Sequence, residues 1–359
     1  MVDLVVIGGG PAGSATAILT ARAGARVALL EAGNFPRHKV CGEFISGEAL
    51  HLLAELIPSD RLHLLRQAPS ISRSRLFLDG KIVEVPVNPP AASVPRFDLD
   101  RALWEAAVTS GVEACEQTKV LSISGTGPFR CIMADRQVEA RALVNATGRW
   151  SNLHKVQTGS SHWIGLKAHF REPIPSPTVD LYFFEGGYCG VQPTGVEGQG
   201  LINASAMVRA DIASSFPAVL ARHAALAERS ARWEALFPPI ATAPLVFGTP
   251  RPVRDGMMMV GDAAGFVDPF VGDGISLALR SGALAAASLA AFVSGEIPLT
   301  ESLNRYADRY RRHLLPVFRT SSALRRLLAL PGKVRIPFHH PQHEALNGDQ
   351  ARRVRADVQ

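Results

Sequence analysis

One segment near the start of the chain constrains its fold more than any other feature. Gly8-Gly-Gly-Pro-Ala-Gly13 fits the pattern G-x-G-x-x-G. It stands between an apolar run at 3–7 and an alanine-rich stretch at 11–23 with helical character, and residues 26–31 form a second apolar run. Together these segments predict a β-α-β unit, and therefore a parallel sheet.

The glycines of this segment have separate predicted roles. Gly8 permits the tight turn, Gly10 lets a pyrophosphate approach the backbone, and Gly13 lets the helix pack closely on the strand. The helix N-terminus at Pro11 and Ala12 then faces the phosphates. The segment therefore predicts a dinucleotide site.

An acidic residue and a second glycine-rich segment narrow the ligand to FAD. Glu31 ends the second strand eighteen residues after Gly13, where a carboxylate can accept hydrogen bonds from a ribose. Gly261-Asp-Ala-Ala-Gly-Phe-Val-Asp-Pro-Phe-Val-Gly-Asp-Gly-Ile275 follows a short apolar run and precedes a long helical pattern. There Asp262 can bind a ribityl hydroxyl, and amides at Gly272 to Ile275 can face the pyrimidine edge of a flavin.

Several ordered motifs resemble the p-hydroxybenzoate hydroxylase superfamily of FAD-dependent oxidoreductases, and within it the geranylgeranyl-reductase-like branch. They are Gly8 to Gly13 with Glu31, Pro36 to Glu43, Arg96 with Asp100 and Leu103, Ala146-Thr-Gly148 with Ser151, and Gly261 to Gly274. The resemblance implies an α/β fold, with a Rossmann-type FAD-binding domain and a second domain built on a mainly antiparallel sheet. It also implies that further residues contact FAD: Arg37, Cys41, Gly42, Arg96, Gly148, Gly261, Asp262, Pro269, Gly272, Gly274 and Ile275. NAD(P)H is expected as a transient reductant, since no second G-x-G-x-x-G follows a strand.

The segment Lys39-Val-Cys-Gly-Glu43 resembles the Lys-x-Cys-Gly stretch that lies beside the flavin in the reductase branch. Cys41 is therefore a candidate catalytic residue, with pocket lining as the alternative. Tyr188 is the second candidate. It belongs to Gly187-Tyr-Cys-Gly-Val-Gln-Pro193, which stands where prenyl reductases carry Tyr-x-Trp-x-Phe-Pro. Other candidate pocket residues are Trp163, His169 and Phe184, each of which could equally be sheet packing.

The reaction is left open between three readings. Gly190 and Gln192 replace the two large apolar residues of the prenyl-reductase pattern, so a monooxygenase that hydroxylates a hydrophobic aromatic or polyketide-like molecule is favoured. Reduction of isoprenoid double bonds is the alternative, supported by the Lys-x-Cys-Gly stretch. A non-enzymatic flavin-binding redox sensor is the third reading. Gly187 to Pro193 also lacks the Trp-x-Trp-x-Ile-Pro pattern of flavin halogenases.

The remaining pattern predicts two domains. The FAD-binding domain is expected at 1–160 and 250–335, the substrate domain at 161–249 and a tail at 336–359, with part of 66–95 joining the second domain as an alternative. Strands are expected at 73–78 and 81–87 around an Asp79-Gly80 turn, and at 117–123, 129–134, 137–145, 163–170, 178–184, 188–193, 200–208, 245–248 and 257–260. Helices are expected at 47–65, from Asp98, and at 211–235, 275–294 and 301–329.

Charge and cysteine content bear on partners and location. The net charge is +6, and arginines are frequent between 301 and 335, which favours a solvated helix face, with peripheral membrane contact as the alternative. Nothing resembles a nucleic-acid-binding arm. The four cysteines form no C-x-x-C pair, so no metal site is expected, and a cytoplasmic location is favoured. The apolar stretch 275–293 carries Arg280 and is expected to be a buried helix.

Overall fold

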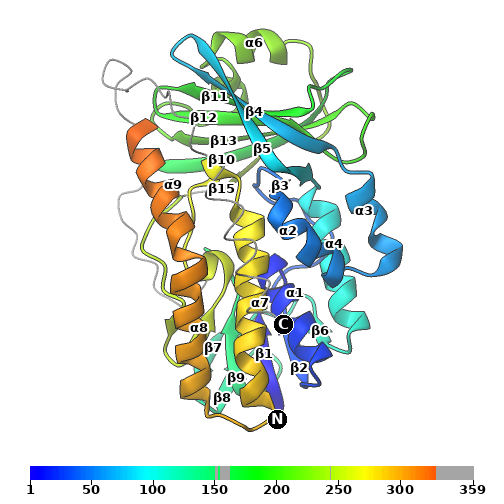
Figure 1. The fold of residues 1–359 in the computed structure, drawn as a ribbon, viewed down its shortest axis with the longest axis vertical. Coiled ribbons are helices and arrows are strands. Elements are labelled where there is room, and N and C mark those ends of the chain that lie inside the picture. The colour runs from blue at the N-terminus through cyan, green and yellow to red at the C-terminus, as the bar shows by residue number, and fades with distance from the viewer. Residues whose placement is uncertain (150–152, 154–161, 243, 329–359) are drawn as a thin grey trace.

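The computed structural model describes residues 1–149, 153, 162–242 and 244–328. Within this part, one sheet lies at each end of an elongated molecule, and long helices run from the first sheet toward the second (Figure 1). Ser151 and the expected tail at 336–359 lie outside the described residues.

The first sheet is built around parallel strands, as the sequence predicts. Strand β1 pairs in parallel with β2 and β9, and β9 pairs in parallel with β17. Helix α1 connects β1 to β2, which confirms the β-α-β unit. The strands in spatial order are β16 (Val253–Arg254), β17 (Met257–Met259), β9 (Gln137–Asn145), β1 (Val2–Ile7), β2 (Val27–Leu30) and β6 (Glu113–Cys115), and β7 (Ser122–Ser124) and β8 (Phe129–Ile132) form a hairpin on β9.

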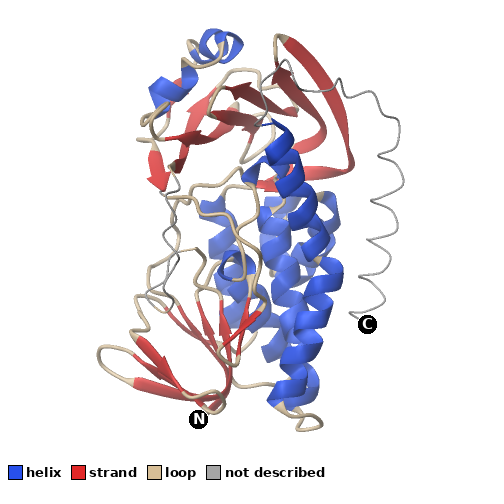
Figure 2. Ribbon diagram, turned by 90° about the vertical axis from the view of Figure 1, so that its left-hand side faces the viewer, coloured by secondary structure: helices blue, strands red, loops and turns tan. Residues whose placement is uncertain are grey.

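Helices pack together on one side of the first sheet (Figure 2). Two of them, α1 and α7, approach closely because small residues face each other; a Cβ atom on Gly282 would lie 2.4 Å from the Ala12 carbonyl oxygen. The helices are α1 (Pro11–Arg22), α2 (Gly47–Leu56), α3 (His63–Arg66), α4 (Arg96–Thr109), α7 (Gly274–Val293), α8 (Leu299–His313) and α9 (Leu315–Leu328). Short 3-10 turns occur at Ser59–Arg61, Gly261–Ala263 and Pro269–Val271.

Helix α7 is long and apolar enough to cross a membrane, but most of it is buried against the rest of the molecule. It contacts α1, α2 and α8. This burial is what the sequence predicts for the stretch 275–293.

The second sheet is mainly antiparallel, as predicted, and among its described strands only β11 and β4 pair in parallel. The hairpin of β4 and β5 turns at Asp79-Gly80 and adds to this sheet. Helices α5 (Phe216–Leu220) and α6 (Ala224–Ser230) pack on its outer face. The strands in order are β14 (Glu234–Ala235), β10 (Trp163–Arg171), β13 (Leu201–Arg209), β12 (Gly187–Pro193), β11 (Thr178–Phe184), β4 (Ser70–Leu78), β5 (Lys81–Ser93) and β3 (Phe44–Ile45), and β15 (Ile240–Thr242) pairs with β10.

Two predicted helices are interrupted by proline. The helix expected at 47–65 ends at Leu56, because Pro58 lacks the N–H group that a continuing helix needs. The helix expected at 301–329 divides into α8 and α9 at Leu314, and Pro316 stands in the first turn of α9. Proline is tolerated in a first turn but not in a helix interior.

Three further predictions about elements are wrong. The helix expected at 211–235 divides into α5 and α6, because Ser215 caps α5 and His223 has extended backbone. The strand expected at 117–123 forms only at its end, where β7 begins at Ser122, because Gln117 has a φ angle of 51° that no strand adopts. No strand forms at 245–248, and β15 pairs with β10 instead.

Candidate cofactor and substrate site

The loop between β1 and α1 has the geometry that its glycines predict. Gly8 has a φ angle of 105°, and a Cβ atom there would lie 2.3 Å from the Ala146 carbonyl oxygen. A Cβ atom on Gly13 would lie 1.8 Å from the Gly8 carbonyl oxygen, so this glycine is required for α1 to pack on β1. At Gly10 the nearest atom to such a Cβ is Arg96 Nη2, at 4.0 Å. Gly10 therefore faces open space.

Glu31 holds the loop from the end of β2. The Gly9 amide donates to its Oε2 at 2.8 Å, and the Gly33 amide and Arg37 Nη1 donate to its Oε1 at 2.8 and 2.7 Å. Burial works to raise the pKa of Glu31, but Arg37 and the two amides outweigh it and hold this pKa below its ordinary value. The carboxylate is thus ionised and lies at the edge of the cavity described next.

A cavity of about 1130 Å³ lies between the two sheets and brings the predicted cofactor residues together. It is lined by residues from both ends of the chain and from the second sheet. Gly13 does not line it, in keeping with its packing role. The predicted residues that line it are Gly8, Gly10, Pro11, Ala12, Glu31, Arg37, Cys41, Gly42, Arg96, Gly148, Gly261, Asp262, Pro269, Gly272, Gly274 and Ile275.

Positive charge gathers at this cavity. Arg96 makes a bidentate pair with Asp100, both bonds being 2.7 Å long. Desolvation beside the cavity lowers the pKa of Lys39, and the nearby Arg37 and Arg96 lower it further. Sequence reasoning did not single out Arg149, although it follows the Ala146-Thr-Gly148 motif. Its guanidinium lies 3.7 Å from Asp262 and 4.4 Å from the centre of the Phe266 ring.

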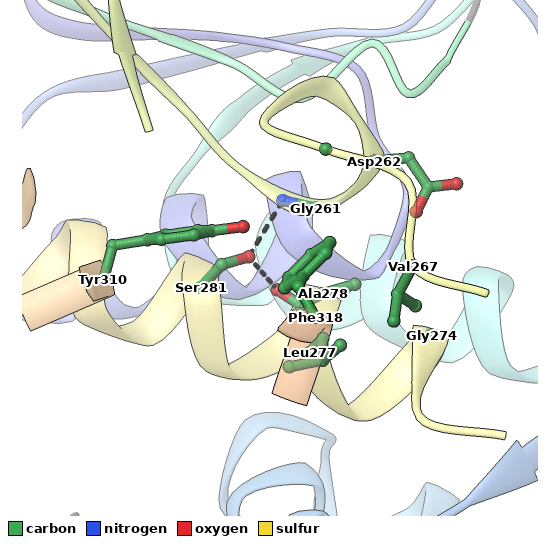
Figure 3. A pocket seen from close by; sticks show the side chains of 10 residues that line it. Gly261, Asp262, Val267, Gly274, Leu277, Ala278, Ser281, Tyr310 and Phe318 are labelled. Carbon is green, nitrogen blue, oxygen red and sulfur yellow. Dashed lines mark hydrogen bonds between the residues drawn. The ribbon is translucent and has the colours of Figure 1, made fainter. Parts of the chain in front are cut away.

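The segment from Gly261 to Gly274 is supported from behind by the last helices. Ser281 Oγ accepts a hydrogen bond from the Gly261 amide at 2.9 Å, beside a hollow of about 10 Å³ that Tyr310 and Phe318 wall off (Figure 3). Asp262 points away from Tyr310 in this view. Burial raises the pKa of Asp262, and Arg149, Arg96 and Lys39 oppose that shift.

The second sheet supplies the opposite wall of the cavity. Tyr188 and Gly190 from β12 line it, whereas Trp163, Phe184 and His169 do not. Phe184 packs on the outer face of the sheet, and its expected place in the pocket is wrong. Trp163 packs beside Tyr188 without reaching the cavity. His169 is on the inner face, but its side chain is bound to Glu43.

A buried ionic cluster behind the Cys41 segment was missed by sequence reasoning. Glu43 accepts hydrogen bonds from Lys167 Nζ, from His169 Nε2 at 2.8 Å and from Thr194 Oγ1 at 3.1 Å. The one available signal was Lys167 and His169 standing two apart in the apolar strand 163–170, which places both on the same face.

Known proteins resemble this chain in sequence and in structure. The family described as pyridine nucleotide-disulphide oxidoreductase matches residues 2–173. The menaquinone reductase of Mycolicibacterium smegmatis is 29% identical over 364 residues, which cover 92% of this chain and 85% of that protein. Digeranylgeranylglycerophospholipid reductase 2 of Methanopyrus kandleri is 27% identical over 343 residues, covering 88% and 84%. The myxobacterial chondrochloren halogenase, an FAD-dependent halogenase, has the same fold with a TM-score of 0.76, at 23% identity over 90% of this chain and 82% of that one.

The chain is an FAD-dependent oxidoreductase, and it shares its fold with FAD-dependent halogenases. The described residues of this flavoprotein fit FAD in two ways. Gly10 leaves room for a pyrophosphate, whose two negative charges match the cations Lys39, Arg96 and Arg149. Within the described part of the chain, Arg37 Nε and Arg149 Nη1 are buried without a hydrogen-bond partner, and both residues line the cavity.

Proposed function

We propose that this flavoprotein reduces a carbon–carbon double bond in the isoprenoid chain of a lipophilic substrate, with NAD(P)H as the source of electrons. The composition of the cavity carries the proposal. The Cys41 thiol lines the cavity, and so does an apolar cluster from the second sheet, from Leu245 and from the Gly261–Gly274 segment. The members of that cluster that line the cavity are Val179, Leu181, Tyr188, Met207, Leu245, Phe266 and Phe270.

Saturating a double bond requires a hydride on one carbon and a proton on the other. Bound FAD, once reduced by NAD(P)H, supplies the hydride. Cys41 is placed to supply the proton, because its sulfur accepts a hydrogen bond from the Glu43 amide at 3.3 Å and lies within interaction range of the Arg96 guanidinium. The S–H bond breaks as the new C–H bond forms, and the sulfur then takes a proton from solvent.

The apolar wall has two consequences for such a reaction. It binds a hydrocarbon chain through burial of apolar surface, at about 25 cal/mol per Å². It also keeps water away from the reacting carbons. Burial raises the pKa of Tyr188, so its hydroxyl is neutral at pH 7 and acts as part of this wall.

Two of the relatives are reductases by name, and one of those names contains the geranylgeranyl group. These names support reduction over oxygenation for this chain. The solved halogenase structures, at identities below 25%, support the fold and not the reaction.

Hydroxylation of an aromatic or polyketide-like molecule is the second candidate, and one observation favours it. Gly190 lines the cavity without a side chain, and the Gln192 amide is occupied with Ser93 Oγ at 2.7 Å. The cavity wall therefore carries no side chain at this position next to Tyr188 on β12, which suits a ring system as well as a chain.

Product analysis with and without oxygen separates the candidates. Purified protein is incubated with NADPH or NADH and a geranylgeranyl phospholipid, a prenylated quinone or an alkylresorcinol, first anaerobically and then under ¹⁸O₂. We expect an anaerobic product that has gained two hydrogens and no ¹⁸O. A product that requires oxygen and carries ¹⁸O would refute the reductase proposal in favour of the monooxygenase. NAD(P)H oxidation without any product in either atmosphere would argue against both.

A further inference from the structure

The buried cluster behind the cavity wall joins the two halves of the molecule. Glu43 comes from the segment that precedes β3, Lys167 and His169 come from β10, and Thr194 directly follows β12. The Glu43 and Lys167 side chains are fully buried. The Glu43 carboxylate also accepts from the Arg96 amide at 3.0 Å, at the first residue of α4. One carboxylate thus links the second sheet, α4 and the cavity wall.

The cluster holds the backbone at Glu43 in an unusual conformation. Glu43 has a φ angle of 62°, in the left-handed region that side chains other than glycine rarely adopt. Its amide donates to Cys41 Sγ at 3.3 Å. Asn203 from β13 donates to the carbonyl oxygens of Cys41 and Gly42 at 3.1 and 2.8 Å. Such a conformation persists only where surrounding contacts determine it.

We propose that Glu43, Lys167 and His169 are positioning residues that hold Cys41 and Gly42 in place against the flavin site. Both held residues line the cavity, as Glu43 itself does, whereas Lys167 and His169 do not. The Glu43 carboxylate is kept ionised by its partners. Burial alone would raise the pKa of Glu43, but the hydrogen bond from His169 and the charge of Lys167 lower it to about 2.

An ionic cluster of this kind is poorly explained as a device for stability alone. Removing two charges from water costs about as much as their attraction returns, and apolar replacement of a whole buried pair is often neutral. The cluster does what an apolar contact cannot. It fixes the orientation of Glu43, because four donors converge on its carboxylate, and the backbone of Glu43 is part of the cavity wall.

A second buried network on the same sheet provides a matched control. Asp180 on β11 is fully buried and accepts from Arg75 Nε at 2.7 Å and Arg229 Nη1 at 2.7 Å. Asp180 does not line the cavity, and its partner Arg229 belongs to α6 on the outer face. Changing Asp180 to Asn therefore disturbs a comparable ionic network away from Cys41.

The experiment compares Glu43→Gln with Asp180→Asn, each in a Cys115→Ser background that removes the other partly exposed thiol. Circular dichroism fixes a temperature at which both variants are folded. Two quantities are then measured there: the rate of Cys41 alkylation by iodoacetamide in FAD-free protein, and the Kd for FAD. We expect Glu43→Gln to change each by at least tenfold. Asp180→Asn should change each by less than twofold, even where it lowers the melting temperature as much.

A double variant keeps the proposal testable where Glu43→Gln does not fold. Glu43→Leu with Lys167→Met removes both charges and leaves no unpaired buried ion. We expect this double variant to fold. Its alkylation rate and its Kd for FAD should each still differ from the wild-type value by at least tenfold, because the convergent hydrogen bonds are gone. Wild-type values in this variant, or equal effects of Glu43→Gln and Asp180→Asn, would overturn the proposal. None of these readouts depends on the reaction, so the failure of the reductase proposal would leave this inference standing.

Discussion

Gly10, which precedes α1, and Gly13, in the first turn of α1, are three residues apart and should respond to alanine in opposite ways. Gly10 has φ and ψ angles of −72° and −178°, which alanine adopts without strain. Its Cβ would meet no atom closer than 4.0 Å. Gly10→Ala should therefore leave the FAD-free protein as stable as wild type, or more stable by about 0.4–1 kcal/mol, because alanine restricts the unfolded chain.

Gly13→Ala has the reverse effect on stability. The new Cβ would start 1.8 Å from the Gly8 carbonyl oxygen, and such contacts essentially never fall below 3.0 Å, so α1 and β1 must move apart by the difference. Overpacking of this kind costs about 1–3 kcal/mol. The free energy of unfolding of the FAD-free protein should fall by at least that amount.

The affinity for FAD is the second property in which Gly10→Ala should differ from wild type. In Gly10→Ala the methyl group projects into the cavity where the pyrophosphate approaches, so we expect the FAD Kd to rise at least tenfold, or about 1.4 kcal/mol. Urea unfolding of FAD-free protein and titration of FAD by flavin fluorescence measure the two quantities. Wild-type FAD affinity in Gly10→Ala would show that the cofactor does not pass this glycine, and equal stability losses in both variants would refute the steric reasoning.

Four further outcomes follow from the site. Asp262→Ala should weaken FAD binding by about 1.5–3 kcal/mol, the value of a hydrogen bond to a charged group, in the same fluorescence titration. Gly190→Trp adds bulk beside Leu181, whose Cδ2 would lie 3.2 Å from the new Cβ, so turnover should fall while the FAD content per chain stays unchanged. Glu43, with its pKa lowered from 4.5 to about 2, contributes stability that is complete above pH 4.5 and is lost as the pH falls toward 2, on the order of 3 kcal/mol; acid unfolding of Glu43→Gln should be flatter in that window. The pairing of Arg305 with Glu301 and of Arg311 with Asp308 favours a solvated face for α8, so we expect no binding to anionic vesicles at low salt; binding that falls steeply as salt is added would instead support peripheral membrane contact.

The cofactor end of the site could be predicted because its signals are local. A strand, a turn of glycines and a helix follow one another within residues 2–22, and each glycine has a steric reason that is independent of the rest of the chain. Asp262 was found in the same way, from its place between β17 and α7. Local patterns of this kind fix backbone geometry before any tertiary contact forms.

The substrate end could not be predicted to the same depth, because it depends on which face of each strand turns inward. On β11 the residues Val179 and Leu181 line the cavity, and Phe184, of opposite parity to both, packs outward. A strand shows alternation in its sequence, but the sequence does not say which half of the alternation faces the cofactor. Both faces of this sheet are covered, so neither half is polar enough to be recognised as solvent-facing.

The ionic contacts show most clearly what local patterns leave out. Glu43 and Lys167 are 124 positions apart, and neither residue alone indicates a partner. What the sequence does contain is a Lys and a His of equal parity in an otherwise apolar strand, which requires a buried acid somewhere in the chain. The Asp180 network satisfies the same requirement on the outer face. Because the two networks lie on opposite faces of one sheet, the inner one can hold the cavity wall while the outer one holds α6, and each can be altered without unpairing the other.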